Sequence, residues 1–319
     1  MRVLVTGIKG FAGRHLVEFL SSKKGVKLHG LGRTSLKNHP HPNIFKQVTF
    51  HPCDILEPKA LEKVLRKVRP EGIFHLAAQS HVFTSWQNPG DTLNTNILGQ
   101  LNLFEAVRRS RLRSKIHIAG SSEAYGLVLP HEIPVKETAL FRPLSPYGVS
   151  KAAQDLLAYQ YGQNFKLPIV RTRTFGQAGP GQSELPVISN FAKQISLIEA
   201  GKQKPVIAVG NLEAVRDFTD VRDVVRAYWL ALEKGEPGEA YNICSGEGHP
   251  ISQLLDVYLK LCRVKVKIRK ELSRMRPSDV MINVGDATKF REQTSWKPEI
   301  PFTTMLLDVL NYWRENIGQ

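Results

Sequence analysis

Short apolar runs alternate with amphipathic segments through the first half of the chain. The runs are rich in Val, Ile and Leu, and they predict strands at residues 3–5, 26–31, 47–52, 72–76, 116–119 and 168–174. Between them, apolar residues recur every three or four positions, which predicts helices at residues 11–20, 61–68, 93–108 and 147–165. Strands separated by helices form a parallel sheet with helices on both faces. We therefore expect an α/β protein with a doubly wound parallel sheet.

The pattern changes after residue 174. Glycine, proline and short helical segments dominate there, and late strands are predicted near residues 240–244 and 264–269. The stretch RVKVKIRK (263–270) alternates apolar and basic residues, which predicts a half-buried strand with one solvated face. We expect a sheet domain and a smaller, discontinuous C-terminal lobe. The sheet domain is assigned residues 1–175 with roughly 219–245, and the second lobe is assigned residues 176–218 and 246–319.

Composition narrows the class of protein. Hydrophobic residues make up 42% of the chain and charged residues 23%, as in ordinary globular proteins. No apolar run approaches the length of a membrane span, and the first apolar run is too short for a signal peptide. The three cysteines lie too far apart for a metal or redox motif. We expect a cytoplasmic protein that binds no metal.

The net charge of +15 raises the question of a nucleic-acid partner. The sharpest basic stretch, residues 263–270, has no interleaved aromatic residues on which bases could stack. We therefore expect neither nucleic acid nor a membrane as a partner. The charge is interpreted as a basic surface, and it is compatible with an anionic small substrate.

A glycine-rich turn joins the first predicted strand to the first predicted helix. The segment TGIKGFAG places Gly7, Gly10 and Gly13 there, with Phe11 and Ala12 at the start of the helix. Glycines permit a tight turn and a close approach of backbone N–H groups to a pyrophosphate, which also lies at the positive end of the helix dipole. The spacing is GxxGxxG rather than GxGxxG. This context predicts a dinucleotide-binding loop.

The ends of the next strands predict which dinucleotide binds. Arg33 follows the second strand, where an acidic residue would favour NAD and an arginine can accommodate the 2′-phosphate of NADP. We therefore expect NADP(H), with NAD(H) as the alternative, since Arg33 could instead stack on adenine in either cofactor. Further cofactor contacts are predicted after the third and fourth strands, at Asp54, Ile55, Leu76, Ala77, Ala78 and Gln79.

Candidate catalytic groups follow the fifth strand and open the long helix. Ser121, Ser122 and Glu123 come where residues 116–119 end, and Tyr147 precedes Lys151 by one helical turn. A cation about 4 Å from a phenol contributes on the order of 4 kcal/mol, enough to bring a tyrosine pKa toward neutrality. We therefore expect Lys151 to lower the pKa of Tyr147. Glu123 is either a base or a hydrogen-bond acceptor.

In this order, TGIKGFAG, HLAAQS, GSSEAYG and YGVSK resemble the extended short-chain dehydrogenase/reductase superfamily, which has a Rossmann fold. The resemblance covers nearly the whole chain and implies a catalytic triad of Ser121, Tyr147 and Lys151, the last two also contacting the cofactor. It implies a homodimer formed through the helices at 93–108 and 147–165.

Segments 172–182, 209–229 and 241–246, with RPSDV at 276–280, resemble the GDP-6-deoxy-D-mannose reductases of this superfamily. This resemblance implies NADPH-dependent reduction of the C4 keto group of GDP-4-keto-6-deoxy-D-mannose. The implied substrate contacts are Ser80, Ser122, Gly176, Gln177, Val187, Lys193, Asn211, Arg216, Arg276 and Asp279. Gly176 and Gln177 depart from the family, which often has Asn and His there.

Other reactions remain open at this stage. A GDP-mannose 4,6-dehydratase would need a base such as Glu123, and such enzymes resemble the Ser121-Ser122-Glu123 run. They typically carry an arginine-rich SPRRG segment where this chain has AGPGQ (178–182). A C4 epimerase would keep NAD bound, against which Arg33 argues. A protein that binds the cofactor without turnover is disfavoured by the complete triad.

Overall fold

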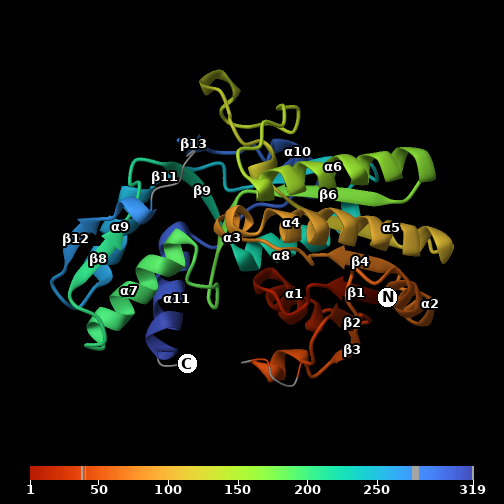
Figure 1. Cartoon of the computed structure of the whole chain (residues 1–319), viewed down its shortest axis with the longest axis horizontal. Helices are drawn as coiled ribbons and strands as arrows, with labels where there is room; N and C mark the ends of the chain where they lie inside the picture. Colours follow the sequence, from red (N-terminus) through yellow and green to blue (C-terminus); the bar gives the residue numbers. More distant parts are fainter. Residues whose placement is uncertain (37–38, 40, 275–279, 318–319) are drawn as a thin grey trace.

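A seven-stranded parallel sheet forms the centre of the protein (Figure 1). The structure is a computed structural model that describes residues 1–36, 39, 41–274 and 280–317. The strand order is β10-β6-β5-β4-β1-β2-β3, so the chain runs outward in both directions from β1. The strands are β1 (Arg2–Thr6), β2 (Lys27–Gly32), β3 (Val48–Pro52), β4 (Gly72–His75), β5 (Lys115–Ser121), β6 (Ile169–Thr174) and β10 (Ala240–Ile243). The predicted doubly wound α/β fold is confirmed.

Two apolar cores cover the two faces of this sheet, because successive strand residues point to opposite sides. In β1, Val3 and Val5 join one core and Leu4 joins the other. Helices α1 (Phe11–Ser21) and α8 (Val221–Lys234) pack in the first core. The second core holds residues of α2 (Pro58–Val68), α5 (Gly99–Arg109) and α6 (Pro146–Phe165).

The predicted helix at 93–108 starts earlier and is interrupted. It begins as α4 (Pro89–Leu93), passes through a π-helical turn, η2 (Asn94–Leu98), and continues as α5. The buried Asn96 in this turn donates from its amide to the Gln79 carbonyl at 3.0 Å and accepts from the Gln79 N–H at 2.8 Å. The turn therefore braces the loop after β4, next to the short helix α3 (Val82–Gln87).

The second lobe contains two small sheets. One joins β7 (Gly176–Ala178), β9 (Val215–Asp220), β11 (Gly248–Pro250) and β13 (Ile282–Asn283), and the other pairs β8 (Val206–Val209) with β12 (Lys267–Lys270). The helices that pack with them are α7 (Val187–Glu199), α9 (Ile251–Leu261) and α11 (Phe302–Glu315). Helix α10 (Thr288–Thr294) instead contacts β10 and α8, and its Phe290 joins the first core. Short 3₁₀ turns are η1 (Pro42–Phe45), η3 (Ser122–Ala124), η4 (Pro130–Glu132) and η5 (Leu272–Arg274). A third apolar core lies among α7, α9 and α11.

The half-buried strand predicted at 263–270 is wrong. Strand β12 covers only Lys267–Lys270, and all of its residues are exposed, Ile268 to 48%. The reason is that β12 is the outer strand of a two-stranded sheet, and its partner β8 supplies Ile207 and Val209 to the core. The alternation along the sequence therefore did not mark a buried face.

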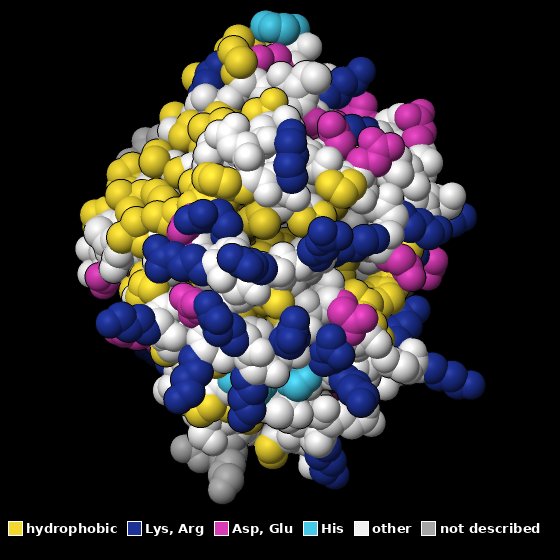
Figure 2. Space-filling view, turned by 90° about the vertical axis from the view of Figure 1, so that its right-hand side faces the viewer, with side chains coloured by type: hydrophobic (Ala, Val, Ile, Leu, Met, Phe, Trp, Pro, Cys, Tyr) yellow, Lys and Arg dark blue, Asp and Glu magenta, His cyan; other side chains and the backbone are white. Residues whose placement is uncertain are grey.

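Lysine and arginine side chains crowd the face shown in Figure 2. Helices α2 and α5 end on this side, and their last turns carry Arg66 and Lys67, and Arg108 and Arg109. Cations at a helix C-terminus are favoured by the helix dipole. Part of the excess positive charge therefore stabilises helix ends. Within the described part of the chain, no helix is long and apolar enough to cross a bilayer.

Candidate active site

A cavity of about 1440 Å³ runs along the carboxyl ends of the central strands and into the second lobe. Ligands of doubly wound sheets bind at this edge, where the strand order reverses. The cavity is lined at one end by the glycine loop after β1, in the middle by the end of β5 and the start of α6, and at the far end by α7 and β9.

The glycine loop is a cradle for a pyrophosphate. Gly7 has a positive φ of 68°, and a Cβ there would lie 2.6 Å from the Ala77 nitrogen, so the loop packs directly on the loop after β4. The Gly10 N–H donates to the Gly7 carbonyl at 2.9 Å and closes the turn. Helix α1 then begins without a capping side chain or an acidic residue in its first turn. Its N-terminus is therefore suited to an anion.

Most predicted cofactor residues line this end of the cavity. They are Gly7, Gly10, Phe11, Ala12, Gly13, Arg33, Asp54, Ile55, Leu76, Ala77 and Ala78. Arg33 is exposed, and nearby Lys9 donates a hydrogen bond to Thr34. Gln79 is not among the lining residues, because its side-chain amide donates to the Thr92 hydroxyl and the His81 carbonyl, both at 3.0 Å. Gln79 therefore stabilises the loop after β4 through these hydrogen bonds.

Four predicted catalytic residues meet in the middle of the cavity: Ser121, Glu123, Tyr147 and Lys151. Ser121 is the last residue of β5, and its hydroxyl accepts the Glu123 N–H at 3.2 Å. Tyr147 and Lys151 lie in the first turns of α6, whose N-terminus is capped by the Ser145 hydroxyl. Lys151 is 4% exposed; its Nζ donates to the Ala119 carbonyl at 2.9 Å and lies 5.7 Å from the centre of the Tyr147 ring.

The electrostatics of this group differ from the sequence-based expectation. Burial raises the pKa of Tyr147, a hydrogen bond with Ser121 lowers it, and the Glu123 carboxylate raises it further. Burial lowers the pKa of Lys151 to about 8. The expectation that Lys151 lowers the pKa of Tyr147 is contradicted, because burial dominates and the ammonium is directed to the Ala119 carbonyl. Tyr147 is therefore protonated at neutral pH.

Most predicted substrate residues line the cavity as well. These are Ser80, Ser122, Gly176, Gln177, Val187, Asn211 and Arg216. Arg216 donates from Nη1 to the Val215 carbonyl at 2.9 Å and to the Met281 carbonyl at 3.3 Å. Lys193 is not among the lining residues; its ammonium pairs with Glu184 and lies 5.3 Å from the centre of the Trp313 ring. Arg276 and Asp279 lie outside the described residues.

Gly176 explains one departure from the family pattern. In β7 it pairs with Phe218 of β9, and a Cβ at this position would lie 2.7 Å from the Asp217 carbonyl oxygen and 2.8 Å from the Phe218 ring. A side chain at this position, such as the Asn expected from the family resemblance, would therefore have to displace β9 or the Phe218 ring. The Phe218 side chain lines the cavity beside this position.

Several further polar residues line the cavity and were missed from the sequence, among them Thr174, Tyr228 and Asn283. The hydroxyls of Thr174 and Tyr228 share a hydrogen bond of 3.1 Å, and Asn283 donates to the Ser122 hydroxyl at 3.2 Å. Thr174 could have been found, because it ends β6 at the same sheet edge as Ser121. Asn283 stands in a two-residue strand without any periodicity. Among the described residues, no group of metal-ligating side chains is arranged to hold an ion.

Comparison with known proteins finds relatives whose names all refer to GDP-linked mannose sugars. A family model described as GDP-mannose 4,6 dehydratase matches residues 4–309. GDP-6-deoxy-D-mannose reductase of Pseudomonas aeruginosa is 32% identical over 100% of this chain and 99% of that protein. GDP-mannose 4,6 dehydratase 2 of Arabidopsis thaliana is 33% identical over 95% of this chain and 84% of that protein. The human GDP-mannose 4,6 dehydratase is 30% identical over 97% and 90%, respectively.

Solved structures show the same fold. The structure of RMD from Pseudomonas aeruginosa complexed with NADPH has a TM-score of 0.85 at 30% identity, over 98% of this chain and 99% of that chain. The UDP-glucose 4-epimerase of Thermus thermophilus, in complex with NAD, has a TM-score of 0.87 at 30% identity, over 99% and 100%. The similarity thus extends across both lobes.

Proposed function

The chain belongs to the GDP-mannose 4,6 dehydratase family, and we propose that it is an NADPH-dependent reductase of the C4 keto group of GDP-4-keto-6-deoxy-D-mannose. The product would be GDP-6-deoxy-D-mannose, also called GDP-D-rhamnose. The proposed substrate lobe comprises residues 176–218 and 246–319, and the proposed cofactor domain comprises residues 1–175 with roughly 219–245.

One relative supports the direction of the reaction, and Tyr147 is compatible with it. Reduction of a ketone requires a proton donor at the developing alkoxide, whereas a dehydratase or an epimerase must first oxidise the C4 hydroxyl and so needs a base. Burial raises the pKa of Tyr147, and the neighbouring Glu123 carboxylate raises it further. Tyr147 thus keeps the proton that reduction needs, as a phenol with its ordinary pKa near 10 would as well. The direction therefore rests on similarity: GDP-6-deoxy-D-mannose reductase of Pseudomonas aeruginosa is 32% identical over 100% of this chain and 99% of that protein.

Each residue of the site has a separate role in the proposed reduction. NADPH, when bound, would supply the hydride to C4. Tyr147 gives its proton to the alkoxide oxygen, and Ser121, which already contacts Tyr147, hydrogen-bonds the same oxygen. Lys151, held on the Ala119 carbonyl, orients the nicotinamide ribose. Glu123 accepts hydrogen bonds from the sugar hydroxyls.

The choice of NADPH rests on the end of β2. No acidic residue follows this strand to bind the 2′-hydroxyl of NAD, and Arg33 and Lys9 both line the cavity there. Arginine suits a phosphate because its donors are planar and paired. RMD of Pseudomonas aeruginosa, in complex with NADPH, supports the same cofactor. NADH is expected to bind more weakly, and titration with each cofactor compares them.

The GDP moiety would lie in the second lobe. Arg216 offers a guanidinium to the diphosphate from β9, and Asn211 and Val187 line the wall of the cavity. Lys193 could join them by leaving Glu184. Binding of GDP, UDP and dTDP tests this assignment: GDP should bind most tightly, and a preference for either other nucleotide would contradict it.

The test of the reaction supplies the GDP-4-keto sugar with NADPH and follows the absorbance of the reduced cofactor. We expect loss of this absorbance with the wild type and none with Tyr147→Phe, which should still bind NADPH. No loss with the wild type would refute the proposed reaction.

A GDP-mannose 4,6-dehydratase is the second candidate, because the Glu123 carboxylate lies beside Tyr147 and could remove the C5 proton. Several relatives carry that name. Incubation with GDP-mannose alone tests this candidate: a 4-keto product indicates the dehydratase, and unchanged GDP-mannose contradicts it.

A homodimer is proposed through α5 and α6. Val149, Leu156 and Tyr159 form an exposed apolar stripe on α6, and Leu156 is 60% exposed. Figure 2 shows hydrophobic side chains gathered at one side of its face, beside the basic region. Light scattering should give a dimer for the wild type and a monomer for Leu156→Glu; a monomeric wild type would contradict the proposal.

A further inference from the structure

A third buried residue continues the stripe of catalytic residues on α6. Tyr147, Lys151 and Asp155 follow one another at intervals of four, so they share one face of the helix. All three are buried, and Asp155 is only 3% exposed. A buried carboxylate so close to the catalytic lysine requires partners, since an unpaired one would be strongly destabilising.

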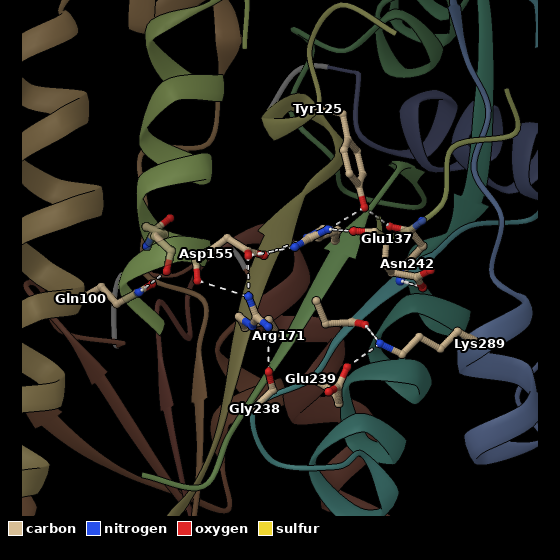
Figure 3. A network of polar contacts seen from close by, with 12 residues as sticks. Gln100, Tyr125, Glu137, Asp155, Arg171, Gly238, Glu239, Asn242 and Lys289 are labelled. Carbon is tan, nitrogen blue, oxygen red and sulfur yellow. Dashed lines mark hydrogen bonds and ion pairs between the residues drawn. The ribbon is translucent and has the colours of Figure 1, made fainter. Parts of the chain in front are cut away.

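Two arginines of β6, Arg171 and Arg173, provide these partners, and Figure 3 shows Arg171 against Asp155. Arg171 donates from Nη1 to Asp155 Oδ1 at 2.7 Å. Arg173 donates from Nε to Asp155 Oδ2 at 2.8 Å and from Nη2 to Oδ1 at 2.9 Å. Burial disfavours the charged form of Arg173, but its hydrogen bonds and attraction to Asp155 outweigh this and raise its pKa. Three charge-assisted hydrogen bonds thus tie α6 to the sheet.

Arg173 also holds the turn that carries Ser121 and Glu123. Its Nη1 donates to the Tyr125 hydroxyl at 2.9 Å and to the Glu137 carbonyl at 2.8 Å. The Tyr125 hydroxyl in turn donates to Asn242 Oδ1 of β10 at 2.7 Å. Tyr125 follows η3 directly, two residues after Glu123. One guanidinium therefore connects the Ser121–Glu123 turn to the helix that carries Tyr147 and Lys151.

The arginines have a second consequence for Lys151. An aspartate four residues after a lysine on the same helix face is near enough to pair with it. Here both oxygens of Asp155 are occupied by Arg171 and Arg173, and Lys151 donates to the Ala119 carbonyl instead. Occupation of the carboxylate thus leaves Lys151 directed to the cavity.

We propose that Arg173 and Asp155 are positioning residues of this active site. Together they fix the separation between the Ser121–Glu123 turn and the Tyr147–Lys151 helix, and Arg173 keeps Asp155 from withdrawing Lys151. The inference rests on the proposed function for the role of Tyr147 and Lys151 in turnover.

The decisive comparison uses Arg173→Met and the double variant Arg173→Met/Asp155→Asn. The single variant frees one oxygen of Asp155 to attract Lys151, so NADPH affinity and kcat should each fall about tenfold, as expected for one charge-assisted hydrogen bond. The double variant removes the competing carboxylate, so NADPH affinity should recover by several-fold. A double variant that binds NADPH no better than the single one would overturn the role given to Asp155.

Arg314→Met is the matched control. Arg314 forms an equally paired, largely buried contact with Glu199, at 2.8 Å from both Nε and Nη2, between α11 and α7. Its loss should lower the melting temperature as much as Arg173→Met does, with kcat and NADPH affinity unchanged. If Arg314→Met reduced kcat equally, the effect of Arg173 would be general destabilisation, and the proposal would be wrong.

Tyr125→Phe is the second probe if Arg173→Met fails to fold. It removes only the hydroxyl between Arg173 and Asn242, and kcat should fall several-fold with KM for the GDP-sugar unchanged. A wild-type kcat would contradict the proposal.

NADPH affinity can be measured without the sugar substrate, so it tests the positioning role independently of the proposed reaction. If the wild type turns over no GDP-4-keto sugar while Arg173→Met still weakens NADPH binding, the proposed reaction fails and the positioning role stands.

Discussion

Replacing Lys151 by methionine should stabilise the protein while abolishing its turnover. Lys151 is buried, and burial lowers the pKa of its ammonium from 10.5 to about 8. This pKa shift means that burying the charged ammonium lowers the free energy of unfolding by about 3 kcal/mol at neutral pH. Methionine removes that cost. It also removes the hydrogen bond to the Ala119 carbonyl, a loss of about 1 kcal/mol, so the net stabilisation is about 2 kcal/mol.

The stabilisation by Lys151→Met depends on pH, because the cost of burying the ammonium does. Below pH 8, the lysine is charged in both states and the whole cost of burial is present. As the pH rises toward 10.5, the unfolded lysine loses its proton as well, and the cost disappears. At about pH 10 less than about 1 kcal/mol remains, which the lost hydrogen bond cancels. The advantage of Lys151→Met should therefore be large at pH 7 and near zero at pH 10.

Urea unfolding of the cofactor-free protein at both pH values measures this difference, since NADPH would stabilise the wild type selectively. Lys115→Met is the control, because Lys115 is an exposed lysine at the start of β5 and should show no difference between the two pH values. A Lys151→Met variant that is less stable than the wild type at pH 7, or whose advantage does not change with pH, would refute the reasoning.

Four further predictions concern the site. Ser121→Ala should lower kcat by about 10²-fold with NADPH affinity unchanged, measured by steady-state kinetics and titration. Arg33→Ala should weaken NADPH about tenfold and leave NADH unaffected in a binding titration. Glu123→Gln should change the reductase rate by less than about tenfold, since loss of a general base would cost about 10² or more. Gly176→Asn should lower the free energy of unfolding by about 1–3 kcal/mol in urea, because its Cβ meets the Asp217 carbonyl.

The sequence was sufficient for the central sheet because its strands are buried on both faces. Such strands read as continuous apolar runs, and helices between them force parallel pairing. The π-helical turn at Asn94–Leu98 could not be predicted in this way, since it depends on the Asn96 contacts with the Gln79 backbone. The prediction at 263–270 was wrong for the opposite reason: apolar and basic residues do alternate there, but Ile268, the apolar residue of β12, is exposed.

The position of the candidate catalytic residues was predictable because of a geometric rule. The carboxyl ends of parallel strands meet at one edge, so Ser121 at the end of β5 and Tyr147 at the start of α6 had to lie near the glycine loop. Residues whose role depends on tertiary partners could not be predicted from the sequence. Asp155 has no sequence motif that marks it as a buried ion-pair partner, and only the fold brings Arg171 and Arg173 against it.

Burial sets the chemistry of this site more than the spacing of Tyr147 and Lys151 does. Spacing alone predicts a lysine that ionises the tyrosine, yet desolvation acts in opposite directions on the two groups, raising the pKa of the phenol and lowering that of the ammonium. Both shifts favour the neutral forms, so Tyr147 keeps a proton to give. The raised pKa also makes the phenol a weaker acid, so Tyr147 transfers its proton only to a strongly basic group, such as the alkoxide that forms when a ketone is reduced. The buried carboxylate next along the helix would reverse this balance for Lys151, and its pairing with Arg171 and Arg173 prevents that.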